Sequence, residues 1–336
     1  MSKVKVGING MGRIGRTILR EIFNSNHPLL EVVAVNNPGF TERYVHLLRY
    51  DSCHGKFNKT VEQGDGYITI DGKKVRFFNH RDPAEIPWEE VDVDIVIDGT
   101  GIFKDKEALG RHIKGSVKKV IMCAPGKDLD GTFVFGVNHK DYDPKNHQII
   151  SNASCTTNCL APVAKVIHDT FGIESALMTT IHSYTLDQKI LDASHSDLRR
   201  ARAGAVSMIP TTTGAAKALG MIIPDLKGKV DGLAIRVPTP NVSIVDLSVT
   251  LKKAASVDEI NAAFKKAADS ELKGILAYTE EELVSIDYMS SPFSSTIDSK
   301  LTYAIGRSAK IIAWYDNEFG FSNRVIDLTT YVAENL

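Results

Sequence analysis

The feature that most constrains the fold is a glycine-rich segment near the start of the chain. The alternating run Lys3 to Asn9 predicts a β-strand, and it leads into Gly10-Met11-Gly12-Arg13-Ile14-Gly15, a G-x-G-x-x-G pattern. Residues 16–23 follow with helical spacing, and residues 30–35 predict a second strand. Glycines here permit a tight turn and a close approach of the backbone to a pyrophosphate at the helix N-terminus. Alone the pattern could be a plain glycine turn, but in this βαβ context it predicts dinucleotide binding.

The first half of the chain continues as α/β structure. Residues 93–98 and 118–122 are apolar runs typical of buried strands, and they end beside Thr100 and Cys123. The carboxyl ends of strands in a doubly wound sheet face the cofactor, so both residues are either cofactor neighbours or turn residues. Arg81 is either an adenine-side contact or a surface charge. We therefore predict a Rossmann-type parallel-sheet domain over residues 1–150.

Size and composition restrict the remaining possibilities. A chain of 336 residues exceeds one ordinary core, which predicts two domains. The net charge of −1 offers no general attraction for nucleic acid or an anionic membrane. No apolar run approaches the ~20 residues of a membrane span, and no signal-peptide pattern is present, so a cytoplasmic protein is expected. The four cysteines form no C-x-x-C pair and lie beside no histidine cluster, which predicts neither a disulfide framework nor a metal site.

Cys155 is the leading candidate for a nucleophile. It lies in Ser151-Asn152-Ala153-Ser154-Cys155-Thr156-Thr157-Asn158, after an apolar run and before residues with helical spacing. A thiol at a helix start among small polar residues is expected to have a lowered pKa. The alternative is a small buried cysteine. Pro162 predicts a kink, or a helix that begins later. His182 ends a predicted strand far from Cys155 in sequence, as expected for a thiol–imidazole pair formed by folding.

Two segments of the second half suit phosphate oxygens. Thr211-Thr212-Thr213-Gly214 precedes a helical run, so hydroxyls and free N–H groups meet at a helix start. Arg236 lies inside a strand pattern and needs an anionic partner, and its planar fork matches phosphate. The arginine-containing segment 183–210 lacks periodicity and is expected to be a structured loop that serves a site or a subunit contact.

The second half is expected to form an α+β catalytic domain over residues 151–316. Strict alternation over residues 242–250 predicts a mainly antiparallel sheet with one covered face. Helical spacing predicts helices over residues 257–268 and 325–333. The C-terminal segment, about 317–336, is expected to pack back on the first domain.

Five motifs in order along the chain resemble one family. They are Asn9–Arg16, Ser151–Asn158, His182–Thr185, Pro238–Val242 and Trp314–Glu318. The chain resembles phosphorylating glyceraldehyde-3-phosphate dehydrogenase (type I) over essentially its whole length, and the octapeptide at Cys155 is highly specific. The resemblance implies a homotetramer of glycolysis or gluconeogenesis that oxidises D-glyceraldehyde 3-phosphate to 1,3-bisphosphoglycerate with NAD.

The resemblance also implies roles for single residues. Cys155 would attack the aldehyde, His182 would take the hydroxyl proton, and inorganic phosphate would cleave the resulting thioester. Thr185 and Arg236 would bind the phosphate of the substrate. The residues implied for the attacking phosphate are Ser154, Thr156, Thr213 and Gly214. For the cofactor, the resemblance implies that Arg13 and Ile14 contact the pyrophosphate and that Asn317 holds the nicotinamide carboxamide. The cofactor residues predicted from the glycine loop and the strand ends are Gly10, Gly12, Asn37, Arg81, Thr100 and Cys123.

Several positions depart from the commonest family pattern. Asn37 replaces the usual Asp, which would repel the 2′-phosphate of NADP. Ala193-Ser194 stands where NAD-specific members usually have Leu-Pro, and it is similar to photosynthetic members that use NADP. Pro38 resembles the NAD form, so we predict dual use of NAD and NADP without strict NADP preference. Near the nicotinamide, Cys123 replaces a common Ser, and Phe319 and Phe321 replace a usual Trp and Tyr.

Two alternative functions remain at this point. Erythrose-4-phosphate dehydrogenase shares the fold, the Cys and the His, but its members usually lack the threonine found here as Thr185. A non-catalytic binding protein on the same fold, with RNA or surface partners, is the other alternative. The intact Cys155, His182 and phosphate-binding residues argue against loss of activity, and they do not exclude a second role.

Overall fold

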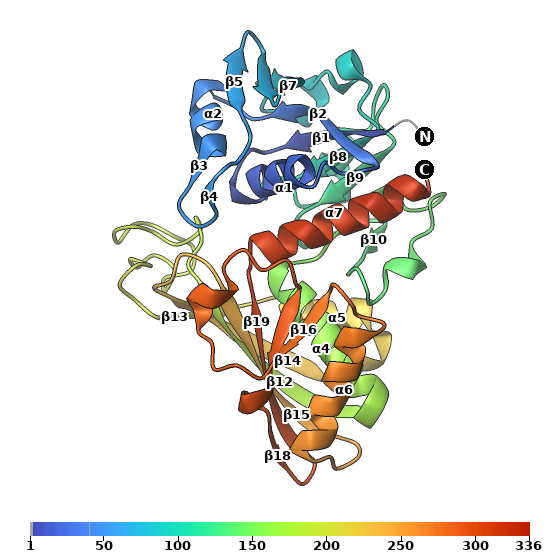
Figure 1. Cartoon of the computed structure of the whole chain (residues 1–336), viewed down its shortest axis with the longest axis vertical. Helices are drawn as coiled ribbons and strands as arrows, with labels where there is room; N and C mark the ends of the chain where they lie inside the picture. The colour runs from blue at the N-terminus through green and yellow to red at the C-terminus, as the bar shows by residue number, and fades with distance from the viewer. Residues whose placement is uncertain (1–2, 40) are drawn as a thin grey trace. The chain divides into compact units, whose positions relative to one another are not determined.

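The computed structural model describes residues 3–39 and 41–336 and divides into two compact units (Figure 1). The first unit contains the chain up to Phe133, then His139–Ala153 and Ser322–Leu336. The second contains Val134–Asn138 and Ser154–Phe321. Each is described separately below.

The first unit is built on a nine-stranded sheet in the order β10-β11-β9-β8-β1-β2-β7-β6-β5. Pairing is parallel from β10 to β7, and only β6 and β5 are antiparallel. This confirms the predicted Rossmann-type parallel sheet. The strands are β1 (Val4–Asn9), β2 (Leu30–Asn36), β5 (Val61–Gly64), β6 (Tyr67–Ile70), β7 (Lys73–Phe78), β8 (Ile95–Asp98), β9 (Lys119–Met122), β10 (Gly131–Thr132) and β11 (Ile149–Ser151).

Burial explains why the central strands read as apolar runs. All four residues of β8 and of β9 are buried, as expected for parallel strands covered on both faces. Trp88 and Leu109 are fully buried in the same hydrophobic cluster as Val96 and Val120. The remaining elements are α1 (Arg13–Asn24), α2 (Thr41–Arg49), α3 (Lys106–Gly110), the ribbon β3 (Tyr50–Asp51) and β4 (Gly55–Lys56), and the 3₁₀ turns η1 (Pro83–Glu85), η2 (Trp88–Val91) and η3 (His139–Asp141).

The second unit contains an eight-stranded sheet in the order β13-β14-β12-β15-β19-β17-β16, with β18 paired to β19. Only β12–β14 and β16–β17 are parallel, which confirms a mainly antiparallel sheet. The strands are β12 (Ile173–Ser183), β13 (Ile209–Thr212), β14 (Val230–Val237), β15 (Ser243–Leu251), β16 (Leu276–Thr279), β17 (Ser295–Asp298), β18 (Tyr303–Ile305) and β19 (Ser308–Tyr315).

Helices cover one face of this second sheet. Central helix α4 (Cys155–Phe171) contacts β12, β15, β17 and β19, and α5 (Ala215–Ile222) and α6 (Val257–Asp269) pack beside it (Figure 1). Ser256 and Glu259 form a capping box that fixes the start of α6, which confirms the helix predicted over 257–268. The 3₁₀ turns are η4 (Pro224–Leu226), η5 (Ser285–Tyr288) and η6 (Ser299–Leu301).

The start of α4 differs from one sequence expectation. The helix begins at Cys155 and continues through Pro162, so the alternative of a later start is wrong. Ser154 caps the helix by accepting a hydrogen bond from the backbone N–H of Thr157, and this cap sets the first turn. Pro162 removes one hydrogen bond inside the helix, but the residues around it are buried against the sheet and hold the helix in place.

The last helix is longer than the sequence pattern indicated. It was predicted over 325–333, and α7 spans Phe319–Glu334. From Ser322 onward its residues belong to the first unit. Between Ser183 and Ile209, a stretch that the structure describes throughout, the chain forms neither helix nor strand, in agreement with a predicted loop.

Candidate active site

Folding brings Cys155 and His182 together within the second unit. Cys155 is the first residue of α4, and His182 lies near the carboxyl end of β12. The Cys155 Sγ is 3.5 Å from the Nε2 of His182. His182 is only 3% exposed, so its ring has a single environment set by the protein. The pair therefore has the geometry of a nucleophile and its base.

The electrostatics of the thiol contradict the sequence prediction. Burial raises the pKa of Cys155, while Arg236 and hydrogen bonds from Thr156 lower it and offset only part of the effect. The expected lowering of the thiol pKa by the helix start is therefore wrong for this arrangement, because the loss of water outweighs the favourable charges. Burial and the charge of Arg236 lower the pKa of His182 to about 3. The resting pair is a protonated thiol facing a neutral imidazole.

Arg236 reaches the same imidazole from the neighbouring strand. It is the register partner of His182 in the parallel pair β12–β14. Its Nη1 lies 2.6 Å from the His182 Nδ1 and 3.0 Å from the carbonyl oxygen of Ser183. The Nδ1 is also 2.7 Å from that carbonyl oxygen.

These contacts define two alternative protonation arrangements. An imidazole nitrogen cannot accept a hydrogen bond from Arg236 while donating its own proton to Ser183. When Nδ1 accepts from Arg236, the neutral ring carries its proton on Nε2, toward the thiol. When Nδ1–H donates to the Ser183 carbonyl, Nε2 has a free lone pair that can take the thiol proton. Base catalysis by His182 requires the second arrangement.

The depressed His182 pKa predicts a specific loss of stability in acid. The folded state keeps His182 neutral down to about pH 3, while the unfolded chain takes up the proton near pH 6.5. Stability is therefore complete above pH 6.5 and falls as the pH drops from there toward 3. Between pH 7 and pH 5 this effect lowers the free energy of unfolding by about 2 kcal/mol. Urea unfolding at both pH values should show a smaller acid loss for His182→Gln than for the wild type. Equal losses would contradict the prediction.

The predicted phosphate residues lie at the starts of two helices. Ser154 caps α4, and Gly214, which has no side chain, is the N-cap of α5. The hydroxyl of Thr213 accepts from the N–H of Ala215. Thr156 is buried and its hydroxyl lies 2.9 Å from that of Tyr315, so its backbone N–H is the group suited to an anion.

Thr185, predicted for the substrate phosphate, lies just after β12. Its hydroxyl is 3.2 Å from the Gln188 side chain.

Arg200 anchors the long loop to β13. Its Nε donates to the hydroxyl of Thr211 at 2.8 Å, and its Nη2 donates to the carbonyl of Thr212 at 3.1 Å. Asp187 pairs with it at 2.6 Å. The charge of Arg200 also helps to lower the pKa of His182. In the sequence, nothing local distinguishes Arg200 from Arg199 and Arg202 within the arginine-containing segment 183–210, so its role could not be predicted.

A straight edge of the first sheet carries most of the predicted cofactor residues. The last residues of five adjacent strands are in register: Phe78, Asn36, Asn9, Asp98 and Met122. The predicted residues Gly10, Gly12, Arg13, Ile14, Asn37, Arg81, Thr100 and Cys123 all follow these strand ends. Asn317 is the exception, since it belongs to the second unit. The carboxyl edge of a parallel sheet is where nucleotides bind.

The glycines of the loop have different structural roles. Gly10 has a φ of +97°, which favours glycine. A Cβ on Gly15 would lie 1.9 Å from the carbonyl oxygen of Gly10, so α1 packs directly on the turn. A Cβ on Gly12 would meet nothing within 4 Å, which leaves its backbone open to a pyrophosphate.

This difference predicts that two matched substitutions affect different properties, one the stability and the other cofactor binding. Gly15→Ala is expected to lower the free energy of unfolding by about 1–3 kcal/mol or more, because backbone atoms must move. Gly12→Ala is expected to change stability by less than about 1 kcal/mol. It should instead raise the KM for the dinucleotide. Denaturant unfolding and cofactor titration of both variants check this, and equal destabilisation would contradict it.

A buried polar network beneath this edge was not found from the sequence. Asn9 accepts from Asn36 and donates to Asp98, both at 2.8 Å. Asp98 binds the N–H and the hydroxyl of Thr100, at 3.1 and 2.7 Å. The only local signal is the polar residue that ends each of the three strands β1, β2 and β8. The network holds Thr100 in place.

Asn37 and Arg13 are already engaged by neighbouring groups. The Asn37 Oδ1 accepts from the N–H of Met11 at 2.8 Å, and its Nδ2 donates to the Pro38 carbonyl at 2.9 Å and to Tyr44. The Arg13 guanidinium forks onto Asp51. Asn37 therefore links strand β2 to the glycine loop.

Charge and burial further define the surroundings. Burial raises the pKa of Cys123, so this thiol is neutral. Over residues 3–39 and 41–336, no group of three or more His, Cys, Asp or Glu side chains could hold a metal ion. No helix in the described chain is long and apolar enough to cross a membrane.

Comparison with known proteins covers both units. Residues 4–106 match the family model described as glyceraldehyde 3-phosphate dehydrogenase, NAD binding domain, and residues 154–317 match the C-terminal domain of the same enzyme. Glyceraldehyde-3-phosphate dehydrogenase of Geobacillus stearothermophilus is 55% identical over 331 residues, 98% of each chain. Glyceraldehyde-3-phosphate dehydrogenase 1 of Bacillus cereus is 54% identical over 329 residues, also 98% of each. A chloroplastic relative, GAPA1 of Arabidopsis thaliana, is 52% identical over 99% of this chain and 85% of its own. The chain therefore belongs to the glyceraldehyde-3-phosphate dehydrogenase family.

Proposed function

We propose that this protein oxidises D-glyceraldehyde 3-phosphate to 1,3-bisphosphoglycerate through a thioester on Cys155, with NAD as the hydride acceptor. The observation that carries the proposal is the Cys155 Sγ, at the N-terminus of α4, which lies 3.5 Å from the Nε2 of a buried, neutral His182. Arg236, beside the same imidazole, supplies a cation for a phosphorylated substrate. Membership of the family agrees with this chemistry.

The chain's own residues account for the acylation half of the reaction. The Cys155 sulfur attacks the aldehyde carbon, the thiol proton passes to the carbonyl oxygen, and a hemithioacetal with a hydroxyl group forms. His182 takes the hydroxyl proton at Nε2 as the carbon is oxidised to the thioester. NAD, when bound, accepts the hydride that leaves this carbon. Arg236 then binds the substrate phosphate together with Thr185. Because Arg236 no longer donates to the Nδ1 of His182, this nitrogen can donate to the Ser183 carbonyl.

The second half of the reaction releases the product. Inorganic phosphate attacks the thioester carbon, the C–S bond breaks, and Cys155 recovers its proton from the His182 imidazolium. The residues proposed to hold this phosphate are Ser154, Thr156, Thr213 and Gly214, at the starts of α4 and α5. Helix N-termini stabilise an anion through their free N–H groups.

Following reduced nicotinamide by absorbance tests the reaction directly. Turnover with glyceraldehyde 3-phosphate should require both cofactor and inorganic phosphate. Erythrose 4-phosphate, run beside it, should give a lower kcat/KM, because Thr185 and Arg236 are both retained. A preference for erythrose 4-phosphate would establish the alternative, and no turnover with either would favour a binding protein.

We further propose that NADP is used alongside NAD. Asn37 carries no charge to repel a 2′-phosphate, and Ala193-Ser194 resembles the sequence of NADP-using members. Asn37→Asp is expected to raise the NAD-to-NADP ratio of kcat/KM by about tenfold or more, since like charges at this range cost ~1–2 kcal/mol. The oxygen that accepts from Met11 is retained in this variant. Asn37→Ser, which adds no charge, is the control. Negligible wild-type turnover with NADP would overturn the proposal.

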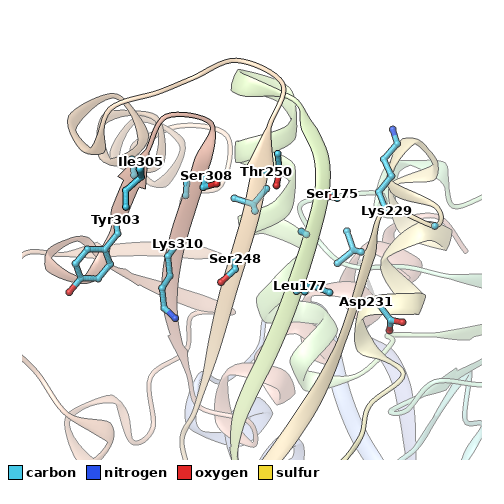
Figure 2. A pocket seen from close by; sticks show the side chains of 16 residues that line it. Ser175, Leu177, Lys229, Asp231, Ser248, Thr250, Tyr303, Ile305, Ser308 and Lys310 are labelled. Carbon is cyan, nitrogen blue, oxygen red and sulfur yellow. The ribbon is translucent and has the colours of Figure 1, made fainter.

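A homotetramer is proposed from exposed apolar side chains. One face of the second sheet carries a hollow of about 740 Å³ (Figure 2). Around it Leu177 is 69% exposed and Ile305 is 83% exposed. Exposed apolar side chains also occur on the long loop: Leu186, Ile190, Leu191, Leu198, Val206 and Met208. Such patches are typical of subunit interfaces. Light scattering should give four times the 36.8 kDa chain mass.

A cytoplasmic location stays a prediction.

A further inference from the structure

Two serine hydroxyls converge on the side-chain oxygen of Asn317. Ser183 Oγ donates to the Asn317 Oδ1 at 2.9 Å, and Ser243 Oγ donates to the same atom at 2.8 Å. Asn317 follows β19, Ser183 ends β12 and Ser243 begins β15, so three strands meet here. The three residues are 6%, 0% and 2% exposed, respectively.

The orientation of the amide follows from where the hydroxyl hydrogens can go. Ser243 Oγ already accepts the backbone N–H of Ser183 at 3.1 Å, and its own hydrogen points to Asn317. In the described part of the chain, neither hydroxyl has another acceptor. If the amide were reversed, Nδ2 would face both oxygens and two buried hydroxyl hydrogens would lose their partners. Leaving such groups unpaired is costly, so Oδ1 stays inside and Nδ2 is the end offered to a ligand.

We propose that Ser183 and Ser243 are positioning residues that hold Asn317 with its N–H groups toward the cofactor, so that the site selects a nicotinamide-type ring bearing a carbonyl acceptor. This inference rests on the proposed use of NAD and on the family resemblance, which implies that Asn317 holds the carboxamide of the nicotinamide. It adds that the carbonyl oxygen of that group is recognised, whereas its amino group is not required. The backbone carbonyl oxygen of Ser183 also lies 2.7 Å from the Nδ1 of His182, and a side-chain substitution leaves this contact in place.

A cofactor analogue distinguishes the two amide orientations. In 3-acetylpyridine adenine dinucleotide a methyl group replaces the amino group, so only the carbonyl oxygen can pair. We expect the wild type to bind this analogue with a Kd within about threefold of that for NAD. Asn317→Asp keeps an oxygen for the serines and presents an oxygen to the ligand. Binding of the analogue should then weaken at least tenfold more than binding of NAD, because the carboxamide can turn its amino group to the new acceptor. An unchanged ratio would overturn the orientation.

Serine substitutions test the positioning itself. Ser243→Ala and Ser183→Ala are expected to raise the KM for NAD about threefold to tenfold, with kcat within about twofold. Alkylation of Cys155 by iodoacetamide without cofactor should keep its rate, and Ser243→Thr, which retains a hydroxyl, should restore the KM. An unchanged KM in well-folded alanine variants would overturn the proposal, as would a fall in kcat alone. Wild-type turnover with NAD is measured first, so failure of the proposed function is seen separately.

Discussion

Replacement of Cys155 by Ser is expected to lower kcat by on the order of 10⁴-fold or more, in the range measured when a covalent nucleophile is removed. A serine hydroxyl is a far weaker nucleophile than a thiol, and the neutral His182 beside it is a weak base for so poor an acid. No covalent thioester should form. Steady-state absorbance measurements and mass spectrometry of the protein mixed with substrate both report this outcome.

The same helix provides a matched control. Cys159 is fully buried, and its sulfur lies 4.0 Å from the Ala313 carbonyl. Cys159→Ala should cost stability through lost packing but should leave kcat within about threefold. Substantial turnover by Cys155→Ser, or a comparable loss of kcat in Cys159→Ala, would contradict the proposed mechanism.

Replacement of His182 by Gln is expected to lower kcat by about 10²–10⁴-fold, the usual contribution of a general base. Gln offers a hydrogen-bonding group near the thiol but cannot take the proton of the hemithioacetal hydroxyl. The loss should fall on the hydride-transfer step, so the rapid burst of reduced nicotinamide should disappear along with steady-state turnover. Stopped-flow absorbance measures both rates in one experiment.

An exposed histidine serves as the comparison for this variant. His46 lies in the last turn of α2, exposed, and His46→Gln should leave the burst and kcat unchanged. A burst of wild-type rate in His182→Gln would show that proton transfer is not limiting, and the role of His182 would have to be reassigned.

Local patterns were sufficient to predict the main architecture. The glycine loop, the strands that surround it and the helical spacing of residues 257–268 are specified by neighbours in sequence, so they could be derived without tertiary information. Cys155 at a helix start was also predictable, because small polar residues precede a helical run. His182 and Arg236 were also predictable as candidates from their places in strand patterns, and the family resemblance then implied their roles.

Properties that depend on long-range contacts could not be derived in this way. The Cys155 pKa depends on burial by segments far away in the sequence, and the sequence-based prediction had the wrong sign. The contact of Thr156 with Tyr315 joins residues 159 positions apart. The Asn9–Asp98 pair and the two serines on Asn317 depend equally on how strands align. Pro162 suggested a later helix start, and this was wrong because burial of α4 outweighs the local helix-breaking preference of proline.

The register of β12 with β14 has a consequence for substrate choice. His182 and Arg236 form one rung of a parallel ladder, and Ile209 of β13 pairs with Arg236 on the other side. Sliding a strand moves a side chain on a given face only in steps of two residues, about 6.6 Å. The backbone spacing between His182 and Arg236 is therefore set by the register and cannot be changed by as little as the length of one carbon–carbon bond. If Thr185 binds the substrate phosphate as proposed, we expect discrimination between phosphorylated aldehydes of different length to depend on loop residues such as Thr185, whose positions are not tied to a strand register.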